Sequence, residues 1–428
     1  MQVPARIANI LLNALKGGVV PRVGLEYVTV GRAPEISAIL NDIDMISDGG
    51  ASFRFIVGKY GSGKSFLLQT IRNYATAKGF AVVDADLSPE RRFAGTKGQG
   101  LATYKELMQN LSTKSKPDGG ALPLVLERWI SGIVTQGDSS AEAAESRIFE
   151  ITNQLEGMVN GFEFAKAVVT YYRAYRADDV ALKSNVLKWF RGEYPTRREA
   201  KADLDINFTV TDENWYDFLK IIAVFLVGAG YKGLFVVIDE LVNIFKIPNS
   251  ITRANNYEKI LTIYNDVLQG KARHIGFLMG GTPQCIEDKY RGVFSYEALR
   301  SRLAEGHFAT ENFKDLTAPI IRLTMLTQEE MYVLVEKLRD IHANLYNYTP
   351  ILSHEDLLYF LTVEYNRVGA STHITPREII RDFIELTNIL HQNPNKSVIE
   401  ILGSNSFEMT KGGLSDEVIH SEFEEFEI

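Results

Sequence analysis

The chain has very little cysteine: Cys285 is the single thiol in 428 residues. One cysteine excludes a disulfide within the chain, and Cys285 belongs to no recognisable zinc or nucleophile pattern. A lone thiol of this kind is most often a small buried residue, so we predict no redox role for it.

Long apolar runs are also absent. The longest, residues 221–230, falls well short of the roughly 20 residues that a membrane-spanning helix needs. The N-terminal residues lack the basic start, the apolar stretch and the small-residue cleavage pattern of a secretory leader. We therefore expect a cytoplasmic protein without membrane contact.

An excess of basic residues is missing as well. The chain has 46 basic and 54 acidic residues, for a net charge of −8, which argues against broad non-specific attraction to nucleic acid but leaves local patches open. The acidic excess is partly concentrated in residues 404–428, which we expect to form a solvated acidic tail. A partner-binding peptide built on Phe423 and Phe426 is the alternative.

A phosphate-binding loop is the most informative feature that the sequence contains. Residues 58–65 read GKYGSGKS and lie between an apolar strand pattern and a helical pattern. Glycines at this spacing let backbone N–H groups surround phosphate oxygens, while the lysine reaches the β- and γ-phosphates and the final serine ligates Mg²⁺. A glycine-rich turn that matches by chance would not explain the strand and helix on either side. The predicted ATP-binding residues are Gly58, Lys59, Tyr60, Gly61, Ser62, Gly63, Lys64, Ser65 and Phe66.

An acidic pair, Asp239 and Glu240, ends the apolar strand pattern of residues 234–238. Many strands end in acidic residues for solubility alone, but together with the loop the pair indicates an ATPase. Asp239 would bind Mg²⁺ together with Ser65, and Glu240 would polarise the attacking water.

The order of the predicted elements indicates an α/β fold. Buried strands are predicted before the loop and at residues 80–86, 234–238, 274–280 and 320–323, with helical patterns between them. Residues 100–210 contain mainly helical patterns, including 148–159, 164–175 and 180–190, and read as a helical insertion. A capping box at Thr327 and Glu330 opens an all-helical C-terminal region.

These patterns predict three regions: a nucleotide-binding domain over 1–326 that carries the insertion, a helical lid over 327–403 and the tail over 404–428. At the N-terminus, residues 1–30 predict an amphipathic helix followed by an extended segment that ends at 28–30.

Four further residues are catalytic candidates, each with a structural alternative. Thr282, at the tip of the strand over 274–280, would contact the γ-phosphate or the attacking water; the alternative is a turn before Pro283. Arg291, Arg300 and Arg302 follow that strand, and an arginine there could act in trans on the γ-phosphate of a neighbouring subunit. Most surface arginines have no such role, and we favour Arg300 or Arg302.

Three residues outside the loop are candidates for nucleotide contacts. Arg377 starts a helix of the predicted lid, where it would report the state of the nucleotide or serve only as a solvated helix residue. Gly31 and Arg32 precede the loop and would line its adenine end.

One segment resembles a nucleic-acid patch, because basic and aromatic residues alternate in it. Acidic residues dilute the positive charge, so a solvated helix face with a buried tryptophan explains the pattern better. The members are Lys188, Trp189, Phe190, Arg191, Tyr194, Arg197, Arg198 and Lys201, with Glu193, Glu199 and Asp203 among them.

The order of loop, acidic pair, polar strand tip, arginines and Thr375-Pro376-Arg377 resembles an AAA+ ATPase with a helical lid, and Gly31-Arg32 is similar to the start of its Cdc6-like branch. The loop, Trp189-Phe190-Arg191-Gly192-Glu193 and Val237-Ile238-Asp239-Glu240 together resemble the BREX ATP-binding proteins of the BrxC/BrxD type. This resemblance covers most of residues 20–390. It implies anti-phage defence, nucleotide-dependent homo-oligomerisation and work on DNA, which we expect to be double-stranded, beside partner proteins such as a helicase.

The chain departs from the general AAA+ pattern in two respects. The strand over 274–280 continues into Gly-Gly-Thr-Pro without the usual asparagine, which puts the rate of hydrolysis in doubt. The insertion is long and suggests a family-specific binding surface, whereas no winged-helix segment is recognisable after the lid.

The leading hypothesis is therefore an oligomeric, Mg²⁺-dependent ATPase that acts on DNA in a defence complex. The alternative is a nucleotide-gated signalling or scaffold protein with little turnover and no direct DNA contact. A small-molecule or nucleotide kinase is disfavoured, because Glu240 supplies a water activator.

Overall fold

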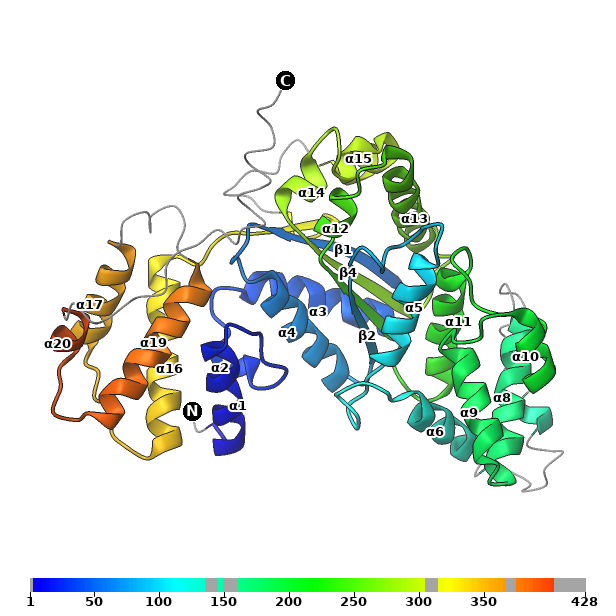
Figure 1. Cartoon of the computed structure of the whole chain (residues 1–428), viewed down its shortest axis with the longest axis horizontal. Coiled ribbons are helices and arrows are strands. Elements are labelled where there is room, and N and C mark those ends of the chain that lie inside the picture. Colours follow the sequence, from blue (N-terminus) through cyan, green and yellow to red (C-terminus); the bar gives the residue numbers. More distant parts are fainter. Residues whose placement is uncertain (1–2, 135–144, 149–160, 305–314, 367–374, 404–428) are drawn as a thin grey trace. The chain divides into compact units, whose positions relative to one another are not determined.

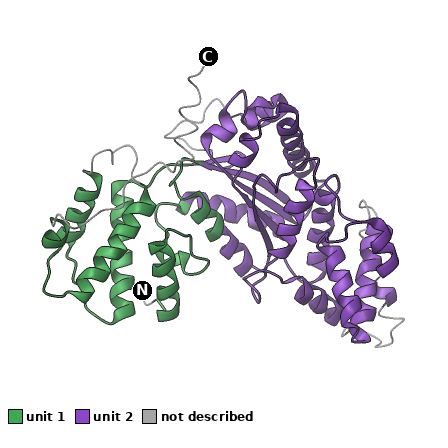
Figure 2. Cartoon of the chain, viewed as in Figure 1, with its two compact units in different colours: residues 1–33, 58–70, 323–428 green, residues 34–57, 71–322 purple. Residues whose placement is uncertain are grey.

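The computed structural model describes residues 3–134, 145–148, 161–304, 315–366 and 375–403. These residues divide into two compact units (Figure 2). Unit 1 comprises 1–33, 58–70 and 323–428, and unit 2 comprises 34–57 and 71–322. Because the phosphate loop and the N-terminal segment group with the C-terminal helices, the units do not follow chain order. The domain boundaries at 326 and 403 stay a prediction.

Unit 2 is built on a five-stranded sheet with the strand order β2-β3-β4-β1-β5. The strands are β1 (Ala51–Gly58), β2 (Ala81–Asp86), β3 (Leu234–Asp239), β4 (Ile275–Gly281) and β5 (Ile320–Leu323). The ladders β2/β3, β3/β4 and β4/β1 are parallel. The predicted α/β fold with a parallel sheet is thus confirmed.

Both faces of the sheet are buried, as is usual for parallel strands. Phe53, Phe55 and Val57 alternate along β1 and belong to one large apolar core, which also takes in side chains of α11 (Trp215–Gly228) and α13 (Ser250–Leu268). On the other face lies α3 (Ala33–Ser47) (Figure 1). Its Ile46 approaches Gly276 so closely that a Cβ there would lie 2.6 Å from the isoleucine methyl carbon, so β4 needs a glycine at this position.

The chain between β2 and β3 is helical, as predicted. Its described helices of eight or more residues are α5 (Gln99–Gln109), α6 (Leu122–Val134), α8 (Gly161–Arg176), α9 (Val180–Phe190), α10 (Arg197–Leu204) and α11. Helix α5 packs against β2, and α8 packs against α9. Most of the predicted helix over 148–159 lies outside the described residues. After β3 come α12 (Val242–Phe245) and α13, and α14 (Pro283–Glu287) and α15 (Glu297–Leu303) follow β4.

Unit 1 contains the predicted C-terminal helices, namely α16 (Gln328–Tyr346), α17 (His354–Tyr365), α19 (Pro376–Gln392) and α20 (Val398–Leu402). The predicted capping box is present, since the Thr327 hydroxyl accepts from the N–H of Glu330 and the Glu330 carboxylate accepts from the N–H of Thr327. Pro376 takes the first position of α19. The predicted tail over 404–428 lies outside the described residues.

The N-terminal helix α1 (Ala5–Lys16) also belongs to unit 1. Its Leu11 and Leu12 are buried in the same apolar core as α16 and α19. The predicted extended segment that ends at 28–30 is wrong in part, because residues 25–28 form the short helix α2 (Leu25–Val28). Burial of Leu25 and Val28 stabilises this turn of helix, and packing of this kind overrides local propensity.

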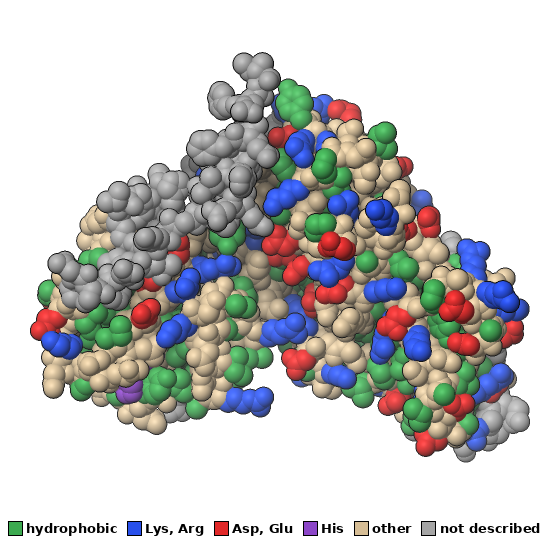
Figure 3. Space-filling model, viewed as in Figure 1, with side chains coloured by type: hydrophobic (Ala, Val, Ile, Leu, Met, Phe, Trp, Pro, Cys, Tyr) green, Lys and Arg blue, Asp and Glu red, His purple; other side chains and the backbone are tan. Residues whose placement is uncertain are grey.

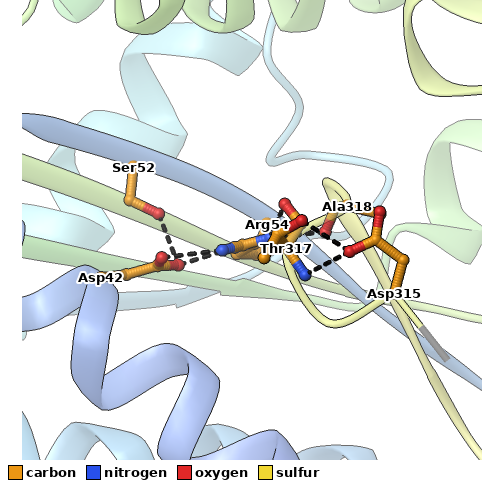
Figure 4. A network of polar contacts seen from close by, with 6 residues as sticks. All are labelled: Asp42, Ser52, Arg54, Asp315, Thr317 and Ala318. Atoms are coloured by element: carbon orange, nitrogen blue, oxygen red, sulfur yellow. Dashed lines mark hydrogen bonds and ion pairs between the residues drawn. The ribbon is translucent and has the colours of Figure 1, made fainter.

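A polar network anchors β1 within unit 2 (Figure 4). The Arg54 guanidinium donates through Nε and Nη2 to both carboxylate oxygens of Asp42, at 2.6 and 2.7 Å, and the Ser52 hydroxyl donates to the same carboxylate at 2.8 Å. Arg54 Nη1 also donates to the carbonyls of Thr317 and Ala318, both at 2.5 Å. One side chain therefore joins β1 to α3 and to the segment that leads into β5.

We expect Arg54→Ala to lower the free energy of unfolding by about 3–5 kcal/mol, because the Asp42 carboxylate, only 10% exposed, would lose its charge partner. Urea denaturation followed by circular dichroism measures this loss. The matched control is Lys201→Ala, whose ion pair with Asp205 is exposed to solvent and therefore screened, so we expect a much smaller loss. Equal losses in the two variants would contradict the structural role of Arg54.

Candidate functional site

The phosphate loop runs from the end of β1 into α4 (Lys64–Ala77). Gly61 and Gly63 have φ values of +79° and +86°, which side chains with a Cβ rarely adopt. The Lys64 ammonium donates to the carbonyls of Gly58 at 2.9 Å and Lys59 at 3.1 Å. The loop is therefore wrapped around its own lysine at the N-terminus of a 14-residue helix, which is the arrangement that favours anions.

The polar groups of the loop fit a phosphate and a hard cation. The Ser62 hydroxyl is 2% exposed and makes no hydrogen bond within the described part of the chain, so it is a buried polar group suited to a ligand. Ser65 supplies an exposed hydroxyl on the first turn of α4. Phe66 follows and packs against the apolar core of unit 1, so it anchors the helix.

Arg32 ties the loop to the segment before α16. Its side chain is buried, and Nη2 donates to the carbonyls of Ser62 at 2.9 Å and Thr324 at 2.6 Å. Gly31 has a φ of +67°, and a Cβ there would collide with the carboxylate of Glu330. The structure thus assigns both residues a bracing role that the sequence did not reveal, while their contact with adenine stays a prediction.

The start of α19 lies on the loop. A Cβ on Gly61 would be 2.9 Å from Thr375 Cβ, so the helix N-terminus and the loop backbone are in close contact. Arg377 Nη1 donates to the Tyr60 hydroxyl at 2.9 Å. The structure therefore brings Arg377 and Arg32 to the loop. Their contacts with the nucleotide, and that of Gly31, stay predictions.

The acidic pair lies at the carboxyl edge of the sheet in unit 2. Because β1 and β3 are parallel with β4 between them, the strand that leads into the loop and the strand that ends in Asp239 finish at the same edge. Asp239 Oδ1 accepts from the N–H of Glu240 at 2.8 Å. Glu240 is exposed and has a φ of +62°, a strained conformation for a glutamate and one that is often retained at functional sites.

A second carboxylate beside Asp239 escaped the sequence analysis. Asp86 ends β2 and is the register partner of Asp239 on β3. Burial raises the pKa of Asp86, and the charges of Asp239 and Asp84 raise it further. The sequence contained a signal for this carboxylate, because residues 80–86 read as a buried strand that ends in an acidic residue, as residues 234–239 do.

Thr282 follows β4 at the same edge. Its hydroxyl accepts from the N–H of Cys285 at 3.3 Å and caps α14, which matches the turn considered from the sequence. Gly281 is required for space, since a Cβ there would be 2.7 Å from the buried Cys285 sulfur. A contact of Thr282 with phosphate stays a prediction.

The candidate arginines differ in their surroundings. Arg300 pairs with Glu297 at 2.6 Å on α15, and Arg302 donates to the carbonyl of Ala298. Arg291 places its guanidinium carbon 5.3 Å from the centre of the Phe245 ring. All three are at least partly exposed, and their action in trans stays a prediction.

Comparison with known proteins gives the family. A family model described as "BREX system ATP-binding protein BrxC/D" matches residues 3–406, which is nearly the whole chain. The chain belongs to this BrxC/D family. No curated protein matches the chain.

The Trp189-Glu193 segment lies in the helical part of the chain between β2 and β3. Trp189 is 1% exposed, and its Nε1 donates to the carbonyl of Phe208 at 2.7 Å. Gly192 has a φ of +70°, and its N–H donates to the carbonyl of Trp189. The N–H of Glu193 donates to the carbonyl of Lys188. These bonds form a Schellman motif, so the segment is the end of α9.

The C-terminal end of α9 packs against α5 and α11. The Tyr104 hydroxyl of α5 donates to the carbonyl of Phe190 at 2.6 Å. Trp189 packs edge to face against Phe218 of α11, at 5.3 Å between ring centres. Trp189 and Phe190 of the basic and aromatic segment thus have a structural role, as the acidic residues within that segment suggested.

Basic and acidic side chains are interspersed on the visible face of unit 2 (Figure 3).

The described residues contain neither a membrane-spanning helix nor a cluster of side chains that could bind a metal ion. No helix among them meets the length and apolarity required to cross a bilayer. Within the same residues, no group of three or more histidine, cysteine, aspartate or glutamate side chains could hold a metal ion. Mg²⁺ needs no such cage, because it keeps several waters and takes one or two carboxylates together with substrate phosphates.

We expect Gly192→Ala to destabilise the protein by about 2–4 kcal/mol. Roughly 1 kcal/mol or more comes from the positive φ, and the rest from a Cβ placed 3.0 Å from Leu101 and 3.1 Å from Tyr104. Gly270→Ala is the matched control, since Gly270 has a φ of +69° but open space around it. Urea denaturation should show a larger loss for Gly192→Ala; equal losses would refute the docking role.

Proposed function

We propose that this BrxC/D protein binds and hydrolyses ATP. The observation that carries the proposal is the phosphate loop, with its two left-handed glycines and its lysine on the loop carbonyls, at the end of a strand parallel to the one that ends in Asp239-Glu240. The family description, a BREX system ATP-binding protein, supports the nucleotide.

The loop and the acidic pair contribute different groups to the proposed reaction. Lys64 binds the β- and γ-phosphates, and glycine-rich backbone N–H groups surround the other phosphate oxygens. Ser65 and Asp239 provide oxygen ligands of the kind that Mg²⁺ takes, and a bound Mg²⁺ would neutralise phosphate charge. Glu240 orients and polarises the attacking water. Thr282, at the same sheet edge, holds that water or the γ-phosphate.

The proposal extends to assembly and to DNA. Arg300, which is partly exposed, or Arg302, which is exposed, would complete the site of a neighbouring subunit from α15, so that ATP promotes a homo-oligomer. BREX membership supports a place among phage-defence proteins. The resemblance described from the sequence implies that the assembly acts on DNA, which we would test first as a duplex. A helicase is the partner class that the resemblance implies, and the cytoplasm is the proposed compartment.

The alternative is a nucleotide-gated scaffold that binds ATP, changes shape and turns it over rarely. Two observations favour it: the net charge of −8, and the structural role of the aromatic residues in the basic segment of the insertion. A kinase is less well supported, because Glu240 follows Asp239; a phosphorylated acceptor among the reaction products would revive it.

We expect Glu240→Gln to retain ATP binding and to lower turnover by at least about 100-fold, because the amide cannot act as a general base. Binding is measured by titration with a fluorescent ATP analogue, and turnover by phosphate release. The control is Glu258→Gln, at an exposed position of α13, which should leave both unchanged. Unchanged turnover in Glu240→Gln would remove the catalytic assignment.

We further expect duplex DNA to stimulate phosphate release and ATP to raise the mass measured by light scattering. Stimulation should weaken as salt rises, since phosphate contacts are screened. ATP binding with neither stimulation nor assembly would instead support the scaffold.

A further inference from the structure

Tyr60, in the middle of the phosphate loop, contacts a side chain far away in the sequence. Tyr60 is 55% exposed, which is unusual for a large aromatic residue. Its hydroxyl accepts a hydrogen bond of 2.9 Å from Arg377 Nη1. The guanidinium carbon of Arg377 also lies 5.5 Å from the centre of the ring, within the range of a cation–π contact. Tyr60 therefore holds Arg377 by two independent interactions.

The backbone around this pair is packed closely. Thr375 and Pro376, at the start of α19, lie 2.9 and 3.6 Å from the position that a Cβ on Gly61 would take. On the other side, a Cβ on Gly18 would lie 3.3 Å from Arg377 Cδ. The aliphatic stem of Arg377 thus lies against the turn after α1, while its charged end reaches the loop.

From these contacts we propose that Tyr60 is a positioning residue that sets the guanidinium of Arg377 for contact with the terminal phosphate of the nucleotide. A guanidinium has five N–H donors in a rigid plane, so the bond to Tyr60 leaves donors for phosphate oxygens. Fixing the side chain in advance lowers the entropy lost on binding. The consequence is selectivity: Tyr60 favours the triphosphate over the diphosphate through Arg377. This inference rests on the proposed ATP site.

The test measures the dissociation constants of ATP and ADP in the Glu240→Gln background, where turnover does not consume the ligand. We expect Tyr60→Phe, which keeps the ring but loses the hydroxyl, to weaken ATP binding about 5-fold. Tyr60→Ala loses both interactions and should weaken ATP binding about 10-fold or more. ADP binding should change by less than about 2-fold in both variants, because ADP lacks the terminal phosphate.

Arg377→Ala tests whether Tyr60 acts through the arginine. If it does, adding Tyr60→Ala to Arg377→Ala should weaken ATP binding no further, since residues that act as one unit are not additive. Tyr290→Ala is the matched control, because Tyr290 is 88% exposed and lies outside the loop. Thermal unfolding of every variant checks that the fold is retained, and Tyr60→Phe remains informative if Tyr60→Ala does not fold.

The possible outcomes separate this inference from the proposed function. Unchanged ATP affinity in both Tyr60 variants would overturn the inference but leave the ATP site in place. Equal losses for ATP and ADP would overturn it by showing that Tyr60 does not act on the terminal phosphate. A full further loss in the double variant would overturn it by showing that Tyr60 acts independently of Arg377. Failure of the parent protein to bind ATP would overturn the proposed function together with the inference.

Discussion

The conformation of the phosphate loop is the constraint on which much of unit 1 depends. Gly61 and Gly63 adopt left-handed φ values so that the chain can turn from β1 into α4 around the Lys64 ammonium. Neighbouring segments approach the backbone closely at Gly61 of the loop and at Gly31 before it, because glycine has no side chain. Thr375 lies on Gly61, and Glu330 lies against Gly31. Glycine therefore has two uses here, since it permits the turn and leaves room for the helices that pack on it.

Unit 2 presents a different kind of constraint at the carboxyl edge of its sheet. Parallel pairing places the ends of β2 and β3 side by side, so Asp86 and Asp239 lie together although one would repel the other when both are charged. Glu240 adds a strained backbone at the same edge. Paired carboxylates and strained backbone lower the stability of a protein, and both are typical of functional sites.

The helical segment between β2 and β3 shows how a pattern that resembles a binding motif can have a structural cause. Trp189 is buried and hydrogen-bonded, and Gly192 ends α9 in a left-handed turn that packs on α5. The alternation of basic and aromatic residues therefore arises because one side of the helix end is solvated and the other docks onto unit 2. This turn holds the segment in place through contacts within unit 2.

The sequence alone determined most of the secondary structure and the location of the phosphate loop, because these depend on residues that are neighbours in the chain. Apolar runs located the five strands of the described sheet, and capping chemistry located the start of α16. The loop and the acidic pair were recognisable because their spacing follows from the chemistry of phosphate and Mg²⁺. Tertiary structure alone decided which distant residues meet. The helix α2, the bracing role of Arg32, the pairing of Asp86 with Asp239 and the bond between Arg377 and Tyr60 all depend on contacts across dozens to hundreds of positions. Such contacts arise from packing, which leaves no periodic signal in the chain.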